Sequence, residues 1–249
     1  MVSTRGNIKR TGLAVAIAML LVCHAATPAR AQSDPEYLME IGGGVGLTGY
    51  LGDFNGKFTR DLQPVGSVVM RRLFNPWAGL KFSGSVGKLK GSAKDVTTFY
   101  PDMQPDVDPT QYGRLTHEFS KTLMDVSAVF EYNFLPYGTG RDYRGAKRVV
   151  PFLFAGLGAT YASGGGQNAM TVNVPMGFGV KCKLASRLNL GVEWGIHFSA
   201  SDELDGVKDP YNIESKGAFK NTDCYQMLQL TLTYSFKARC STCHNADEN

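Results

Sequence analysis

Residues 124–134 read MDVSAVFEYNF. Every second side chain, beginning at Met124, is apolar, whereas the intervening positions carry the carboxylates Asp125 and Glu131. A period of two is the period of a β-strand. A strand of about eleven residues, with one apolar face and one face that carries charge, is typical of a strand that crosses a bilayer at a tilt. The segment therefore predicts one face toward lipid and the other toward a polar interior.

The same alternation occurs in two further segments, RLNLGVEWGIHF at 187–198 and QMLQLTLTYSF at 226–236. Three such segments in one chain favour a membrane-spanning β-barrel. In each of them the apolar face is the face that we expect to contact lipid. The expected lipid-facing residues are Met124, Val126, Phe130, Tyr132, Phe134, Leu190, Val192, Trp194, Ile196, Leu228, Leu230, Leu232, Tyr234 and Phe236.

The first thirty-one positions have the layout of a secretory signal peptide. Basic residues, ending at Arg10, precede an apolar run over 13–26, and Ala29-Arg30-Ala31 provides small residues for cleavage before Gln32. An uncleaved anchor helix is the less favoured alternative, because this run is shorter than the ~20 residues that a spanning helix needs. We expect a signal peptide at 1–31, a transmembrane barrel at 32–236 and a periplasmic tail at 237–249.

The net charge of +4 belongs to the export signal. Arg5, Lys9, Arg10 and Arg30 all lie before the expected cleavage site, and no acidic residue does. The mature chain then has as many basic as acidic residues. With neither a basic excess nor a basic run, nucleic acid is a poor candidate partner.

Eight strands are expected from alternation and from turn residues. We expect all-β structure, an eight-stranded antiparallel outer-membrane barrel, with an interior filled by side chains. The longest connections, 91–115 and 201–222, follow odd-numbered strands, so the sequence predicts long extracellular loops and shorter periplasmic turns. The expected strands are 37–51, 65–74, 77–90, about 117–135, 149–162, 169–184, the segment between a turn at 185–187 and residue 201, and 224–236.

Several motifs near the start of the mature chain resemble PorG-like proteins. They are EIGGG at 40–44, YLGDFN at 50–55, Pro64, VMRRLFNPWA at 69–78 and GKLKG at 87–91. The resemblance is best over 40–91 and looser through Phe236, and its motifs are glycines, turns and strand ends. No residue of the loop at 91–115 can be matched.

PorG-like proteins are outer-membrane β-barrels of the type IX secretion system of Bacteroidota. The resemblance implies an accessory protein without enzymatic activity in the cell outer membrane. Its partners would be outer-membrane lipids, a periplasmic ring lipoprotein and the partner subunit of that lipoprotein. Two alternatives stay open: a free-standing small outer-membrane protein of the OmpA or OmpX type, with loops that contact a host or a solute, and a soluble secreted ligand carrier.

The tail contains Cys240-Ser241-Thr242-Cys243-His244, the Cys-x-x-Cys-His pattern of covalent haem attachment. No apolar segment follows that could enclose a porphyrin, and the tail offers no evident fourth metal ligand. We therefore expect no cofactor and no metal. The favoured hypothesis is a disulfide within the pair Cys240 and Cys243, or a cross-link from one of them to a ring subunit, in the oxidising periplasm.

Four charged residues, Asp125, Glu131, Lys181 and Glu193, could in principle form an acid–base site. Barrel interiors carry such residues in order to satisfy one another, because an unpaired charge out of water is costly. We expect no catalytic residues here, and we expect His197 to be an interior hydrogen-bonded residue. Cys182 and Cys224 lie on separate expected strands and are interpreted as two buried thiols.

Overall fold

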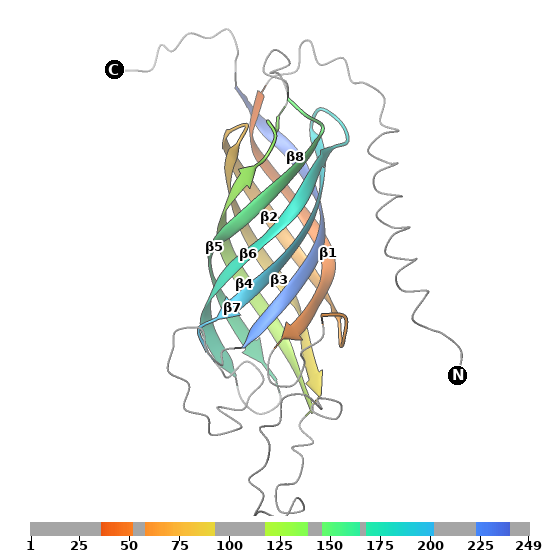
Figure 1. Ribbon diagram of the computed structural model, residues 1–249, viewed down its shortest axis with the longest axis vertical. Coiled ribbons are helices and arrows are strands. Elements are labelled where there is room, and N and C mark those ends of the chain that lie inside the picture. The colour runs from red at the N-terminus through yellow and green to blue at the C-terminus, as the bar shows by residue number, and fades with distance from the viewer. Residues whose placement is uncertain are drawn as a thin grey trace, which may run out of the picture.

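The computed structural model describes residues 36–51, 58–92, 118–138, 146–164, 168–201 and 223–239. Figure 1 shows one barrel of long tilted strands. Among the described residues there is no helix with the length and apolar character needed to span a bilayer. The strands are β1 (Glu36–Leu51), β2 (Gln63–Asn75), β3 (Ala78–Ser92), β4 (Glu118–Asn133), β5 (Val149–Ser163), β6 (Ala169–Lys183), β7 (Leu188–Ser199) and β8 (Cys224–Arg239).

The barrel is closed, and each strand pairs with its neighbours in sequence. All eight pairings are antiparallel, including the β1–β8 pairing that joins the two ends of the sheet from Glu36 opposite Arg239 to Leu51 opposite Cys224. Closure leaves no unpaired sheet edge in the wall. The expectation of an eight-stranded antiparallel barrel is confirmed.

The strand ends differ from the expected ones by a few residues. β8 continues to Arg239, so the expected tail begins three residues too early. Trp77 lies in the β2–β3 turn, where the Asn75 side-chain oxygen accepts hydrogen bonds of 2.8 Å from the backbone N–H groups of Trp77 and Ala78. Such a local side-chain bond ends a strand without any signal in the hydrophobic pattern.

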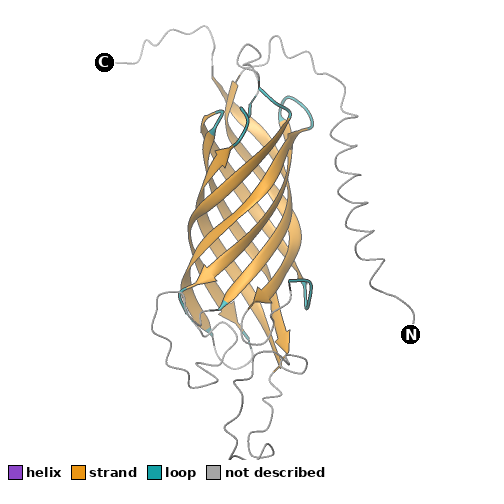
Figure 2. Cartoon of the chain, viewed as in Figure 1, coloured by secondary structure: helices purple, strands orange, loops and turns teal. Residues whose placement is uncertain are grey.

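The connections divide the barrel into two ends, seen in Figure 2. We call the end with the connections 76–77, 134–148 and 184–187 the turn end, and the opposite end, with 52–62, 93–117, 164–168 and 200–223, the loop end. The two longest connections are at the loop end, as expected. The 134–148 connection is nevertheless longer than 52–62 and 164–168, so the expected contrast in length holds for most connections and not for all.

Glycines let β1 approach β8 closely. A Cβ atom on Gly42 would lie 2.0 Å from the backbone oxygen of Leu232, and one on Gly46 would lie 2.0 Å from that of Leu228. No real Cβ atom tolerates such a contact with backbone, so only glycine fits this strongly coiled pair of strands. The glycine-rich sequence of β1 thus has a structural reason at the seam where the barrel closes.

We predict that Gly46→Ala destabilises the barrel by about 2 kcal/mol, because the added methyl group forces β1 away from β8. The matched control is Gly66→Ala on β2, where an added Cβ would meet nothing within 4 Å. The measurement is urea-induced unfolding in detergent micelles. Equal free energies of unfolding for the two variants would contradict the close approach.

Candidate functional site: the apolar outer wall and the charged interior

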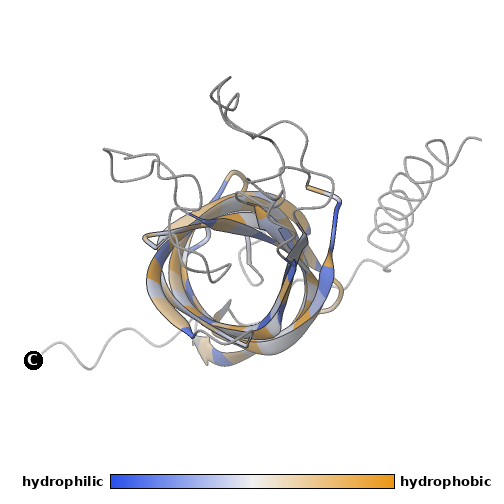
Figure 3. Ribbon diagram, turned by 90° about the horizontal axis from the view of Figure 1, so that it is seen from below, coloured by the Kyte–Doolittle hydropathy of each residue, from blue (hydrophilic) through white to orange (hydrophobic). Residues whose placement is uncertain are grey.

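The outer wall of the barrel is apolar around its circumference, and Figure 3 looks along the axis of the barrel. Burial alternates along β4 with the period that the sequence shows: Val126 is 68% exposed, whereas Val129 is 1% exposed. Large apolar side chains lie exposed on every strand but β7, whose outward side chains are partly covered. The most exposed are Val45, Val68, Val126, Leu157 and Met170.

The structure places every expected lipid-facing residue on the outer face. Nine of them are exposed, and Leu190, Val192, Trp194, Ile196 and Phe236 are partly covered. Phe134 lies just after β4, and its ring packs at 5.7 Å against that of Tyr132. Contact of these side chains with lipid stays a prediction.

The interior is polar at the turn end, where Arg71 lies between two carboxylates. Its Nη1 contacts Glu40 at 2.5 Å, and its Nε donates to Glu131 Oε2 at 2.7 Å. Lys181 Nζ reaches the same Glu131 oxygen at 2.5 Å and also donates to Asn133 at 3.0 Å. All four charged side chains are at most 3% exposed, and we call them the charged layer. Charges so deeply buried are tolerated because each has a partner of opposite sign.

Tyr137 closes the turn end beneath the charged layer. It is buried, and its hydroxyl donates to Glu40 Oε1 at 2.8 Å. Burial raises the pKa of Tyr137 well above its usual value, and the neighbouring Glu40 carboxylate raises it further. The hydroxyl therefore keeps its proton and remains a donor. Lys183 Nζ lies 4.9 Å from the centre of the Tyr137 ring, a cation–π distance.

A second ion pair lies at mid-height. Lys81 Nζ contacts both carboxylate oxygens of Glu193, at 2.6 and 2.7 Å, and lies 4.7 Å from the centre of the Phe154 ring. Ser83 and Ser127 share a hydrogen bond of 2.9 Å at the same inner face. This pair bridges β3 and β7 across the interior, so the polar interior is filled by side chains that bond to one another.

Asp125 lies between this pair and the loop end. Its Oδ2 accepts hydrogen bonds from Asn173 at 2.7 Å, from Tyr225 at 2.8 Å and from Thr160 at 3.2 Å. His197 stacks on the Tyr225 ring at 4.6 Å, and its Nδ1 lies 3.7 Å from Asp125 Oδ2. His197 lies in the interior, as expected, but the expected hydrogen bond is not made by its Nδ1, which has no hydrogen-bond partner among the described residues.

The four charged residues weighed as an acid–base site belong to separate clusters. Lys181 pairs with Glu131 in the charged layer, Glu193 pairs with Lys81, and Asp125 bonds to neutral donors. Within the described part of the chain, no three His, Cys, Asp or Glu residues form a group that could hold a metal ion. The arrangement offers ion pairing and hydrogen bonding.

This orientation, apolar outside and charged inside, is the opposite of that of a soluble ligand carrier. Such a carrier has an apolar interior that binds its ligand and a polar exterior that contacts water. The alternative of a soluble secreted carrier therefore does not fit the distribution of side chains.

A family model described as a domain of unknown function, DUF6089, matches residues 36–245. The match spans all eight strands. This chain belongs to the DUF6089 family. No curated protein matches its sequence.

Three solved structures resemble the DUF6089 barrel. The attachment invasion locus protein Ail of Yersinia pestis, solved with the heparin analogue sucrose octasulfate, has 11% identity, a TM-score of 0.42, and a match that covers 82% of this chain and 100% of Ail. Neisserial surface protein A has 13% identity and a TM-score of 0.46, and the match covers 80% of this chain and 97% of that protein. The outer membrane enzyme PagL has 15% identity and a TM-score of 0.36, and the match covers 77% of this chain and 97% of PagL. At such identities and TM-scores, these likenesses do not indicate what the DUF6089 chain binds or does.

The cysteines correct one expectation. Cys182 is disulfide-bonded, and Cys224 carries a thiol. The interpretation of two buried thiols is therefore wrong for Cys182. Cys240 and Cys243 lie outside the described residues, so the hypothesis of a bridge or cross-link at these positions stays a prediction.

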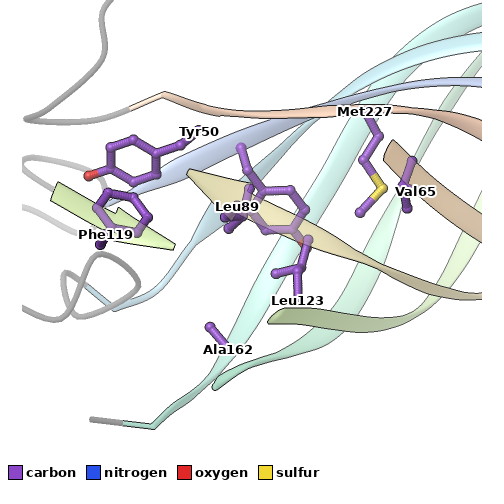
Figure 4. Packing of buried hydrophobic residues seen from close by; sticks show 8 residues of the cluster. Tyr50, Val65, Leu89, Phe119, Leu123, Ala162 and Met227 are labelled. Carbon is purple, nitrogen blue, oxygen red and sulfur yellow. The ribbon is translucent and has the colours of Figure 1, made fainter. Parts of the chain in front are cut away.

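Sequence reasoning missed an apolar cluster inside the loop end of the DUF6089 barrel, shown in Figure 4. The Tyr50 and Phe119 rings meet edge to face at 5.0 Å, and Tyr50 donates to the Asp223 carboxylate. Strand parity could have found Leu123, which is apolar on the face that carries Asp125. The cluster comprises Tyr50, Val65, Leu89, Phe119, Leu123, Ala162, Tyr225 and Met227.

Proposed function

We propose that this protein is a non-enzymatic outer-membrane barrel of the type IX protein secretion machinery, which contacts the periplasmic ring lipoprotein and its partner subunit. The observation that carries the membrane part of the proposal is the closed barrel with an apolar outer wall and a charged interior. Burying exposed apolar surface in hydrocarbon is favourable, whereas in water a wall of this extent would cause aggregation. The secretion part rests on the PorG-like motifs over 40–91.

The placement of those motifs agrees with a structural role. The EIGGG motif lies on β1 at the seam with β8, and the VMRRLFNPWA motif covers the end of β2 and the β2–β3 turn. Within VMRRLFNPWA, Arg71 points inward to the charged layer, and Arg72 is exposed on the outer face. These two motifs thus lie at the barrel seam and at the turn end.

The turn end offers a surface for a partner. Arg72, Lys147, Arg187 and Lys237 are exposed there. Among the described side chains, the carboxylates nearest to this end are Glu40 and Glu131, which are buried inside. An exposed surface of one sign attracts a partner surface of the opposite sign. We therefore assign the turn end to the periplasm and to the contact with the ring.

The test is affinity purification of the tagged barrel from native cells after mild cross-linking. We expect the ring lipoprotein and its partner subunit to be recovered. We also expect recovery to fall several-fold in a Lys147→Glu, Lys237→Glu variant at the turn end. The matched control is Lys88→Glu, Lys90→Glu, on outward positions of β3 at the loop end, where recovery should not change.

A barrel recovered alone, together with intact type IX export after its deletion, would refute the secretion role. It would instead favour a free-standing outer-membrane protein of the OmpA or OmpX type. Recovery in the aqueous fraction without detergent would refute the membrane location itself.

A further inference from the structure

A small cavity, lined by both polar and apolar side chains, lies at mid-height inside the barrel, apart from the surfaces used above. Its volume is about 20 Å³, and its lining includes Lys81, Ser85, Asp125, Ser127, Glu193 and His197. This is room for one particle of the size of a water molecule. The charged layer lies on one side of the cavity and the apolar cluster on the other, so an occupant would be held away from bulk water.

The side chains around the cavity leave one negative charge without a partner. Lys81 is held by both oxygens of Glu193, so these two charges cancel. Asp125 is 2% exposed, and its three donors, Thr160, Asn173 and Tyr225, are neutral. His197, 3.7 Å away, offsets the Asp125 charge only when its ring carries a second proton. A buried carboxylate without a cation is costly.

Three buried atoms around Asp125 have no hydrogen-bond partner: Asp125 Oδ1, Asn173 Oδ1 and His197 Nδ1. The two oxygens are acceptors only, if Asp125 is ionised. Asn173 donates to Asp125 Oδ2 at 2.7 Å, but it is not among the residues that line the cavity. Ser85 is the direct cross-strand partner of Asp125, and Ser127 follows on the same inner face of β4. Oxygens of Ser85, Asp125 and Ser127 line the cavity, and the ammonium group in its lining, that of Lys81, is already held by Glu193.

We propose that this cavity binds one monovalent cation of the Na⁺ class, held by Asp125 Oδ1 together with the hydroxyl oxygens of Ser85 and Ser127. Hard cations prefer oxygen ligands of this kind. A single positive charge cancels the single negative charge of Asp125, whereas a divalent ion would leave an excess of positive charge. The site does not depend on the secretion role.

The test uses the full-length mature barrel in detergent micelles and compares sodium chloride with choline chloride at equal concentration. We expect the Tm to be higher in sodium by roughly 2–5 °C. We also expect ²³Na relaxation to be faster with the barrel than with micelles alone. Asp125→Asn should abolish both effects. Asp61→Asn, a carboxylate outside the barrel interior, is the control and should keep them.

If Asp125→Asn fails to fold, the unmodified barrel and Ser85→Ala still test the cation site. Ser85→Ala should weaken the sodium effect on Tm and on ²³Na relaxation. Equal Tm values in the two salts with no change in ²³Na relaxation would overturn the proposal and leave only water in the cavity. A Tm that is independent of sodium and rises as the pH falls through the titration of His197 would also overturn it, because the compensating charge would then be a proton.

Discussion

Replacing Glu131 by Gln is expected to destabilise the barrel by about 3–4 kcal/mol, one of the largest single effects of any conservative change in this chain. Glu131 is fully buried and is the carboxylate that Arg71 and Lys181 share. Without its charge, Glu40 alone would have to balance both cations. Two like charges held close together in a medium of low dielectric constant repel strongly.

The control for Glu131→Gln is Glu118→Gln on the same strand. Glu118 is exposed and accepts a long bond of 3.4 Å from Ser92, so its neutralisation should change stability by less than about 1 kcal/mol. Urea unfolding in micelles measures both. A second variant, Glu131→Gln with Lys181→Met, should recover part of the loss, because one carboxylate then faces one guanidinium. Equal effects at Glu131 and Glu118 would show that the charged layer is not needed.

Replacing Val126 by Arg is the second large expected effect, and it acts on the outer wall. Val126 is 68% exposed at the middle of β4 and faces outward. A guanidinium on the lipid face near the bilayer midplane costs about 2–4 kcal/mol. We expect the folded fraction in lipid vesicles to fall sharply, as measured by the heat-dependent shift in migration of barrels on SDS gels.

The matched control is Ser120→Arg, also outward on β4 but close to the loop end. Ser120 lies directly opposite Lys90 on β3, so a charge is already accommodated at this depth. Its cost should be about 0–1 kcal/mol. If Val126→Arg folded into vesicles as well as Ser120→Arg, the outer wall would not be embedded in hydrocarbon.

The sequence predicts the fold well because successive side chains of a β-strand point to opposite faces, and in a closed barrel these faces are the outside and the inside. In β4, β7 and β8, enough of the inward positions carry polar residues for the sequence to show which side chains face inward and which face outward. β5 is different: its inward Phe152 and Phe154 are as apolar as its outward Leu153, so periodicity cannot assign its two faces. The inward and outward faces of β5 can therefore be assigned only from the polar residues of the neighbouring strands.

The interior clusters could not be predicted in the same way. Strand parity puts Glu40, Arg71 and Glu131 inside, but their contacts depend on the stagger between strands and join residues far apart in the sequence, such as Arg71 and Glu131, which are 60 positions apart. The disulfide of Cys182 was missed for a related reason, because a cysteine on a strand carries no sign of its partner. The third strand was expected to begin at Trp77, but it begins at Ala78 because the Asn75 side chain holds the backbone N–H groups of Trp77 and Ala78 in the turn.

The most direct test of the central claim uses two native valines on one strand, with no mutation. Val126 is 68% exposed on the outer face, and Val129, three residues later, is 1% exposed inside. The measurement is methyl NMR of ¹³C-labelled valines in lipid nanodiscs that contain a lipid with a nitroxide near the end of its acyl chain. We expect strong broadening of the Val126 methyl signals and sharp Val129 signals. Broadening of Val129 with Val126 unaffected, or no broadening of either, would contradict a barrel whose apolar wall faces lipid.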